Sequence, residues 1–253
     1  MMKILVVTAH PDDEAIWFGS TLYELSQLPD VEIAVICLWG VLEPPGSMQA
    51  IQPGYSDLDR KDQFYEACRC LHIARAHLVT EVQCPVTKGV NQSFENITVE
   101  FLRALATVGL EKIDLLISHS PYGDEHKHRH HQMLYEFTKA YGIHSSIPFS
   151  FFSVLPLPGV SHVPMLHSTR RRNQLHVVNY ASCSNGLYFV QFQGHLSRKL
   201  EAIRCYKAID FETHFAGYSA FSLVVENLYF EESAKGVIDA LVHQIPEVSR
   251  AII

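Results

Sequence analysis

Four polar side chains follow a short apolar run near the start of the chain, in the segment His10-Pro11-Asp12-Asp13-Glu14. Imidazole and carboxylate are ligands that Zn²⁺ prefers in proteins. His10 and Asp13 are separated by two residues across a turn, so both can converge on one cation and leave Asp12 beside it as a base. The alternative is a helix N-cap, because acidic groups are stabilised at helix starts. A turn alone would not require four polar side chains, so we favour the metal site.

A second group of polar residues lies near the middle of the chain. Five of the fifteen histidines fall between residues 119 and 131. This run follows another apolar segment, so it is expected at the same carboxyl edge of a sheet as the first group, where open α/β sheets build their sites. Taken singly, His119 and His126 are expected to be solvated. The cluster as a whole indicates a metal site opposite His10 and Asp13.

Together the two segments resemble the PIG-L/LmbE-like family of zinc deacetylases. That family opens with an AHPDDE motif after the first strand, which is present here at Ala9–Glu14. It carries a His-x-Asp-His run after the fourth strand, which here reads His128-Arg129-His130-His131. The chain departs from the pattern at His130, where an aspartate is usual, and at Ala208-Ile209, where many members have Ser-Gln. The resemblance implies that residues 1–253 form a single deacetylase domain.

The resemblance also implies roles for individual side chains. The zinc ligands would be His10, Asp13 and His131. Asp12 matches the general base, and His128 matches the histidine that stabilises or protonates the tetrahedral intermediate. Arg60 matches a less specific Arg-x-x-Glu helix motif that faces substrate, with Gln63 in place of the glutamate. We expect Tyr122 near the carbonyl oxygen of the substrate.

These roles predict hydrolysis of an N-acyl group. Two histidines and one carboxylate leave a position on zinc for water, as in catalytic rather than structural sites. The expected reaction removes an acetyl group from an amino sugar or a similar N-acylated small molecule, with Zn²⁺ as the cofactor and other divalent metals possible. A homo-oligomer is compatible with the sequence.

The spacing within the histidine run predicts which member binds the metal. Helix positions three apart share a face, whereas adjacent positions diverge by about 100°. If residues 128–131 form a first helical turn, His128 and His131 look into the site together. His130 should then point sideways, in contact with a ligand or with solvent.

Three other functions are alternatives to a zinc-dependent deacetylase. A nucleotide-binding protein is disfavoured because Pro11 and three acidic residues stand where phosphate-cradling glycines would be needed. A non-catalytic metal-binding relative would not need Asp12 and His128 beyond the three ligands. An amidase or esterase acting on a non-sugar conjugate stays open, since the pocket loops decide the substrate.

The elements that must position these residues follow an alternating pattern. Four apolar runs are predicted to be buried parallel strands: Ile4–Thr8, Ile33–Leu38, His77–Val82 and Leu115–Ser118. Helices are expected between and after them, at residues 15–25, Asp59–Leu71, Ile97–Val108 and Arg129–Tyr141. Further on we expect a strand at Phe149–Leu155, an antiparallel pair at Leu175–Val178 and Leu187–Val190, and helices at Leu196–Ile209 and Ser233–Gln244. Glu226–Phe230 resembles a protease tag site, which we interpret as coincidence. The fold expected is a Rossmann-like three-layer α/β/α domain with a mostly parallel sheet and a short antiparallel addition.

Composition excludes several classes of protein. A formal charge of −7 over 253 residues disfavours a nucleic-acid binder. No stretch approaches the length of a membrane span. The six cysteines form no CxxC pair and no regular framework, which favours reduced thiols. We therefore expect a cytoplasmic enzyme with a small-molecule partner.

Overall fold

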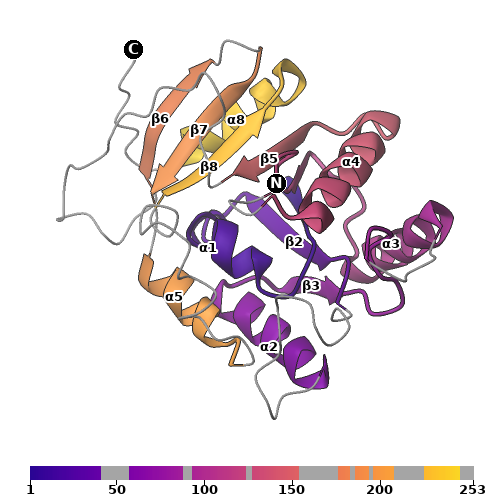
Figure 1. Cartoon of the computed structure of the whole chain (residues 1–253). Helices are drawn as coiled ribbons and strands as arrows, with labels where there is room; N and C mark the ends of the chain where they lie inside the picture. Colours follow the sequence, from indigo (N-terminus) through magenta and orange to yellow (C-terminus); the bar gives the residue numbers. More distant parts are fainter. Residues whose placement is uncertain are drawn as a thin grey trace.

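The computed structural model describes residues 1–40, 57–87, 93–123, 127–153, 176–182, 186–193, 196–207 and 225–245. Within these ranges one sheet of eight strands is covered by helices (Figure 1). The strands are β1 (Met2–Thr8), β2 (Val31–Cys37), β3 (Arg75–Leu78), β4 (Leu115–Ser118), β5 (Phe149–Ser153), β6 (His176–Ser182), β7 (Tyr188–Gln193) and β8 (Val225–Phe230). The helices are α1 (Asp13–Ser26), α2 (Asp57–Cys70), α3 (Phe94–Val108), α4 (Arg129–His144), α5 (Leu196–Arg204) and α8 (Glu232–Gln244).

The strand order is β3-β2-β1-β4-β5-β8-β7-β6. The first five strands are parallel, and Ile4 of β1 pairs with Ile33 on one side and Leu115 on the other. The antiparallel part begins at β8, which pairs with β5, and continues through β7 to β6. This mostly parallel α/β fold with an antiparallel addition confirms the predicted fold class.

Helices cover both faces of the sheet, and the alternation along β1 shows how. Ile4 and Val6 pack in one apolar cluster with residues of α1, α2, α5 and α8, whereas Leu5 and Val7 pack in a second cluster with α3 and α4. Successive side chains of a strand point to opposite faces, so a strand covered on both sides is apolar throughout. The continuous apolar run of β1 therefore follows from its central place in the sheet.

The pattern missed one strand and shifted others. Residues 226–230, interpreted as a coincidental tag-like sequence, lie in β8, which joins the parallel and antiparallel parts of the sheet. Strand β3 covers 75–78 rather than 77–82, and β6 extends to Ser182. The predicted segment ends at Leu155 and Ile209 lie outside the described residues, as does Ala208.

The order of the strands creates the place for a site. From β1 the chain runs outward through β2 to β3, and then returns to place β4 on the other side of β1. The carboxyl ends of β1 and β4 are therefore neighbours at a topological switch point, where open α/β sheets bind their ligands. His10 follows β1 directly, and His119 follows β4. None of the described helices is long and apolar enough to cross a membrane.

Candidate active site

Three side chains meet at this edge, and one nitrogen of each histidine lies close to the other and to one of the two Asp13 oxygens. His10 Nδ1 lies 3.4 Å from Asp13 Oδ2, and His131 Nε2 lies 3.3 Å from both His10 Nδ1 and Asp13 Oδ1. All three residues are buried, at 6%, 3% and 2% exposure. Zinc bonds of 2.0–2.1 Å in tetrahedral geometry separate ligand atoms by about 3.3–3.4 Å. The residues present therefore fit the edges of a tetrahedral metal site, and the three form one of the possible metal clusters among the described residues.

The carboxylate of Asp13 is held from two directions. Its Oδ1 accepts a hydrogen bond from the indole Nε1 of Trp17 at 2.9 Å, and its Oδ2 accepts one from the backbone N–H of His10 at 2.7 Å. Trp17 stands one helical turn after Asp13 in α1, which brings the two side chains onto one face. Donors that fix a ligating carboxylate are the usual support of a metal site.

His119 corrects one prediction. Expected to be solvated, it is 2% exposed, and its Nε2 lies 3.1 Å from the backbone N of Ala9 and 3.2 Å from Asp13 Oδ2. Its ring stacks on that of His131, with centroids 3.9 Å apart. Because β4 lies beside β1, the first residues after both strands converge. His119 thus packs directly against two of the predicted ligands. His126 lies outside the described residues.

Asp12 occupies the N-cap position of α1 but makes no side-chain capping hydrogen bond. Its backbone has φ 134°, a conformation that is rare outside glycine and that clusters at functional sites. The backbone N–H of Asp12 donates to Glu14 Oε2 at 3.2 Å. The structure therefore gives this carboxylate no capping duty to explain its presence.

Arg60 of α2 lies against the same turn. Its Nη2 donates to the carbonyl oxygen of Pro11 at 2.7 Å and lies 3.5 Å from Asp12 Oδ2, and the side chain is almost wholly buried. The resemblance assigned Arg60 to substrate, and that assignment stays a prediction. The observed contacts are to the backbone and carboxylate of the first motif.

The pKa values of the two neighbouring aspartates are shifted in opposite directions. Burial raises the pKa of Asp12 well above its usual value, and Arg60 offsets part of that rise. Burial would also raise the pKa of Asp13, but His131, His119 and His10 together hold it well below its usual value. A bound cation would further favour both carboxylates in their ionised form. Asp13 is thus the stronger anion and Asp12 the one more able to exchange a proton.

The remaining histidines are neutral at physiological pH. Burial, with the nearby His131 and His10, lowers the pKa of His128 to about 2. Burial and His10 lower that of His130 to about 3, and burial and His131 lower that of His119 to about 4. Burial also lowers the pKa of His10. Neutral imidazole is the form that ligates metals.

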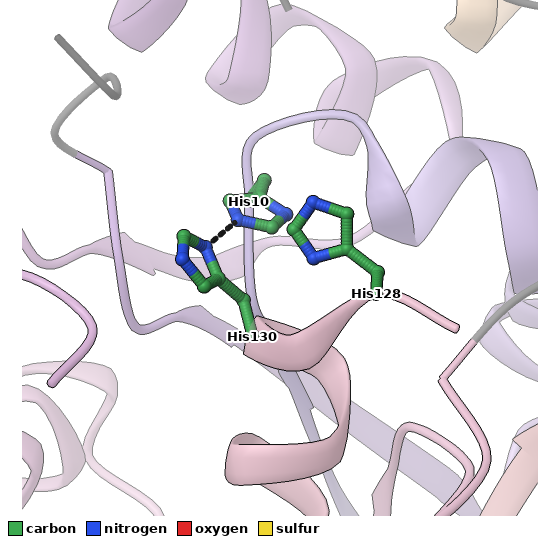
Figure 2. Close-up of side chains that lie close together, drawn as sticks. All are labelled: His10, His128 and His130. Carbon is green, nitrogen blue, oxygen red and sulfur yellow. Dashed lines mark hydrogen bonds between the residues drawn. The ribbon is translucent and has the colours of Figure 1, made fainter. Parts of the chain in front are cut away.

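Residues 128–131 were expected to form the first turn of a helix, but α4 starts at Arg129 and His128 is its N-cap. His128 faces His131, with ring centroids 4.7 Å apart. His130 is buried and its Nδ1 hydrogen-bonds with His10 Nε2 at 2.8 Å, so the solvent alternative for it is wrong. Adjacent helix positions both reach His10 because its two ring nitrogens point to different sides. Figure 2 shows His128 and His130 entering from the start of α4 to meet His10.

Tyr122 differs from these residues in its exposure. It is 49% exposed on the loop after β4, where its backbone N–H donates to Ser120 Oγ at 3.2 Å. An exposed ring beside a buried cluster is available to a ligand, and its contact with substrate stays a prediction.

Sequence reasoning missed three supporting residues. Trp17 is both buried and bonded to Asp13, and its i, i+4 spacing from Asp13 was the available signal. Thr87 Oγ1 lies 2.9 Å from His130 Nε2. The Tyr206 hydroxyl donates to Glu14 Oε1. The last two come from distant segments, and no local pattern indicates them.

Solved structures with the same fold include two deacetylases and a hydratase. The A40926 pseudoaglycone deacetylase Dbv21 is 16% identical with a TM-score of 0.58, over 90% of this chain and 96% of that one. The N,N'-diacetylchitobiose deacetylase of Pyrococcus horikoshii is 15% identical with a TM-score of 0.52, over 87% and 75%. The 4-carboxy-2-hydroxymuconate hydratase of Pseudomonas putida KT2440 is 12% identical with a TM-score of 0.51, over the whole of both chains.

No curated protein matches the chain significantly. The sequence profile of the family described as PIG-L, GlcNAc-PI de-N-acetylase, matches residues 5–141. That range contains every residue of the two motifs and spans more than half of the chain. The protein therefore belongs to the PIG-L family.

Proposed function

We propose that this protein is a zinc-dependent hydrolase that removes an N-acetyl group from an amino sugar or a similar N-acylated small molecule. Membership of the PIG-L family and the two deacetylases that share its fold support a deacetylase of sugar-like substrates. The observation that carries the proposal is the convergence of His10 Nδ1, His131 Nε2 and the two Asp13 carboxylate oxygens, whose contacts of 3.3–3.4 Å match ligand separations in a tetrahedral zinc site.

In this proposal His10, Asp13 and His131 hold the ion. When bound, zinc lowers the pKa of water to roughly 7 and polarises the acyl carbonyl. The protein supplies the donors, the exclusion of bulk water by burial, and the groups that move protons. Trp17 and the backbone N–H of His10 keep the Asp13 carboxylate oriented toward the other two donors.

Asp12 acts as the base. It takes a proton from the attacking water and passes it to the departing amine, so that one water is consumed for each acetate released. Arg60 Nη2 lies 3.5 Å from Asp12 Oδ2 and offsets part of the rise in pKa that burial causes. A base needs a pKa between those of the group it deprotonates and the group it later protonates, and a carboxylate with a raised pKa meets that need better than an ordinary one.

His128 stabilises the oxyanion rather than protonating the amine. The resemblance left both roles open, and a histidine with a pKa of about 2 carries no spare proton near neutral pH. A neutral imidazole still donates one N–H, which can bond to the carbonyl oxygen as negative charge develops on it. We assign His128 this role and keep Tyr122 as an expected contact of the substrate carbonyl.

The test is a screen of N-acetylated sugars that measures released acetate, run with and without a chelator. We expect cleavage that is lost with the chelator and restored by added Zn²⁺. Asp12→Asn should keep the metal and the fold while losing a hundredfold or more in kcat, on the order of what a positioned base contributes. Asp239→Asn changes an aspartate in α8 far from the motifs and should behave like the parent.

Each other outcome has a meaning. Cleavage of N-acyl conjugates without a sugar would replace the substrate class and keep the chemistry. A parent that binds zinc tightly and cleaves no N-acyl compound would overturn the proposal in favour of a non-catalytic relative. The 4-carboxy-2-hydroxymuconate hydratase of similar fold is a reminder that the fold alone does not decide the reaction. A cytoplasmic location stays a prediction, as does the single domain.

A further inference from the structure

A second group of nitrogen donors adjoins the first, and His10 belongs to both. The rings of His10, His128 and His130 form a nearly regular triangle, with centroids 5.0, 5.1 and 5.0 Å apart (Figure 2). One donor nitrogen from each lies within 4.8 Å of the others. The only residue outside the usual family motif among them is His130, which stands where an aspartate is common.

The spacing of the rings is that of a three-histidine metal site. Three imidazoles bound to one tetrahedral ion through bonds of 2.0–2.1 Å place their ring centroids about 5.2 Å apart. The observed separations are within a few tenths of an ångström of that value. The His10 Nε2 to His130 Nδ1 distance of 2.8 Å is a hydrogen bond, so these two rings must open by about half an ångström to admit an ion.

The rings are also oriented as ligands. Thr87 Oγ1 lies 2.9 Å from His130 Nε2, which leaves Nδ1 directed at His10. Metal-binding histidines usually hold their second nitrogen in such a bond. His128 Nδ1 is buried and has no hydrogen-bond partner among the described residues. A buried nitrogen without a partner is costly unless something else binds it.

We propose that His10, His128 and His130 form a second metal site that takes an additional divalent ion of the zinc or copper type and thereby inhibits the enzyme. Three imidazoles and no carboxylate favour such borderline ions over Mg²⁺ or Ca²⁺. The inhibition rests on the proposed function, because the second ion would occupy His128, the oxyanion donor. The metal site itself does not depend on it.

The two sites can be filled together because His10 offers a different nitrogen to each. Its Nδ1 faces Asp13 and His131, and its Nε2 faces His130. With both nitrogens bound, His10 gives up its remaining ring proton to solvent and bridges the two ions. Binding of the second ion therefore releases one proton from His10.

The experiment is a zinc titration of the whole protein by equilibrium dialysis with metal analysis. We expect the parent to bind about two equivalents and His130→Ala about one, because each site has three donors and the substitution removes one from the second site only. Asp13→Ala should also bind about one, at the second site. His144→Ala removes an exposed histidine from the far end of α4 and controls for surface binding; it should keep both.

Two further measurements make the proposal specific. Thr87→Val should weaken the second ion alone, by about ten- to a hundredfold, since it removes only the bond that orients His130. Excess zinc should inhibit acetate release by the parent at least tenfold more effectively than by His130→Ala, each measured against its own uninhibited rate. A parent that binds one equivalent, or a His130→Ala protein that still binds two, refutes the second site.

The outcomes also separate this proposal from the deacetylase proposal. A second ion that depends on His130, in a protein that cleaves no N-acyl compound, would keep the site and remove the proposed function. Both sites filled in the parent with no loss of turnover would refute the inhibition.

Discussion

Two buried polar clusters contact α1, one at Ser20 and Thr21 and the other at Asp13, and they differ in how their charges are paired. Lys199 of α5 and Glu226 of β8 form an ion pair at 2.8 Å, with side chains 0% and 1% exposed. The Glu226 carboxylate also accepts the backbone N–H groups of Ser20 and Thr21 at 3.0 and 2.7 Å. Every charge in that cluster meets an opposite charge or a donor within the protein.

The histidine cluster lacks that closure. The Asp13 carboxylate contacts the imidazoles of His10, His119 and His131. One nitrogen each of His10, His128 and His130 lies within 4.8 Å of the others. His10 and His130 share a hydrogen bond, whereas His128 Nδ1 is buried and has no hydrogen-bond partner among the described residues. A buried cluster whose charged and polar groups all have partners within the protein stabilises the fold. A buried cluster with an unpartnered polar group indicates a bound ligand.

The largest expected effect is on metal binding. His131→Ala removes one of three donors from the first site, so the protein should lose the ion of that site and its turnover. Any zinc that this variant still binds should be lost when His130 is also replaced by Ala. The metal-free variant should remain folded, because the ring it removes serves the ion more than the core. Metal analysis and circular dichroism of the same sample check both parts. Two equivalents of zinc bound by this variant, as by the parent, would transfer the ligand role to another histidine.

The complete cluster should respond in stability instead. Lys199→Met leaves Glu226 buried without its cation, which should lower the free energy of unfolding by about 3–5 kcal/mol. Urea denaturation in the presence of a chelator measures this without a contribution from metal. Lys199→Met with Glu226→Gln should recover part of the loss, since the glutamine still accepts a backbone N–H of α1. A change below about 1 kcal/mol in the single variant would contradict a structural role for the pair.

His128 tests the proposed division between ligand and oxyanion donor. His128→Ala should keep the first ion and reduce kcat by about 10²–10³, the usual cost of one oxyanion donor. His128→Gln should restore much of the rate, because a neutral amide N–H can replace the neutral imidazole N–H. A Gln variant as slow as the Ala variant, with an alkaline limb of the pH profile that is lost in both, would instead make His128 an acid.

Glu14 is buried, and the hydrogen-bond donors that contact its carboxylate are neutral: the Tyr206 hydroxyl and the backbone N–H of Asp12. Burial raises its pKa from 4.5 to about 7, despite the hydrogen bond from Tyr206. The folded state then holds the proton more tightly than the unfolded state, so stability falls as pH rises from about 4.5 through 7. Relative to Glu14→Gln, the metal-free parent should lose about 3 kcal/mol between pH 5 and pH 8. Parallel pH dependence of unfolding in the two proteins would show that Glu14 ionises freely.

The local sequence pattern predicted most of the parallel strands and their helices. It predicted few of the contacts between distant segments that complete the two buried polar clusters. Buried strands such as β1 and the Ala9–Glu14 motif are contiguous in sequence, so their position and chemistry were predictable. Strand β8 was missed because residues 226–230 carry a glutamate and an asparagine whose partners, Lys199 and Gln191, come from other elements. His119 and Thr87 were missed for the same reason, since their contacts with Asp13 and His130 exist only once β4 lies beside β1.

The smallest predicted effect separates two buried tryptophans. Trp17 donates its indole N–H to Asp13, whereas Trp39 is 2% exposed with an indole N–H that has no hydrogen-bond partner among the described residues. Trp17→Phe keeps most of the apolar volume and removes the donor, so zinc affinity at the first site should fall by about ten- to a hundredfold. Trp39→Phe is the matched control, because its ring packs 6.0 Å from that of His130 without bonding to a predicted ligand. Zinc affinity measured by competition with a chromogenic chelator should change for Trp17 and not for Trp39. Equal losses in both variants would mean that packing around the histidines, rather than the hydrogen bond to Asp13, sets the affinity.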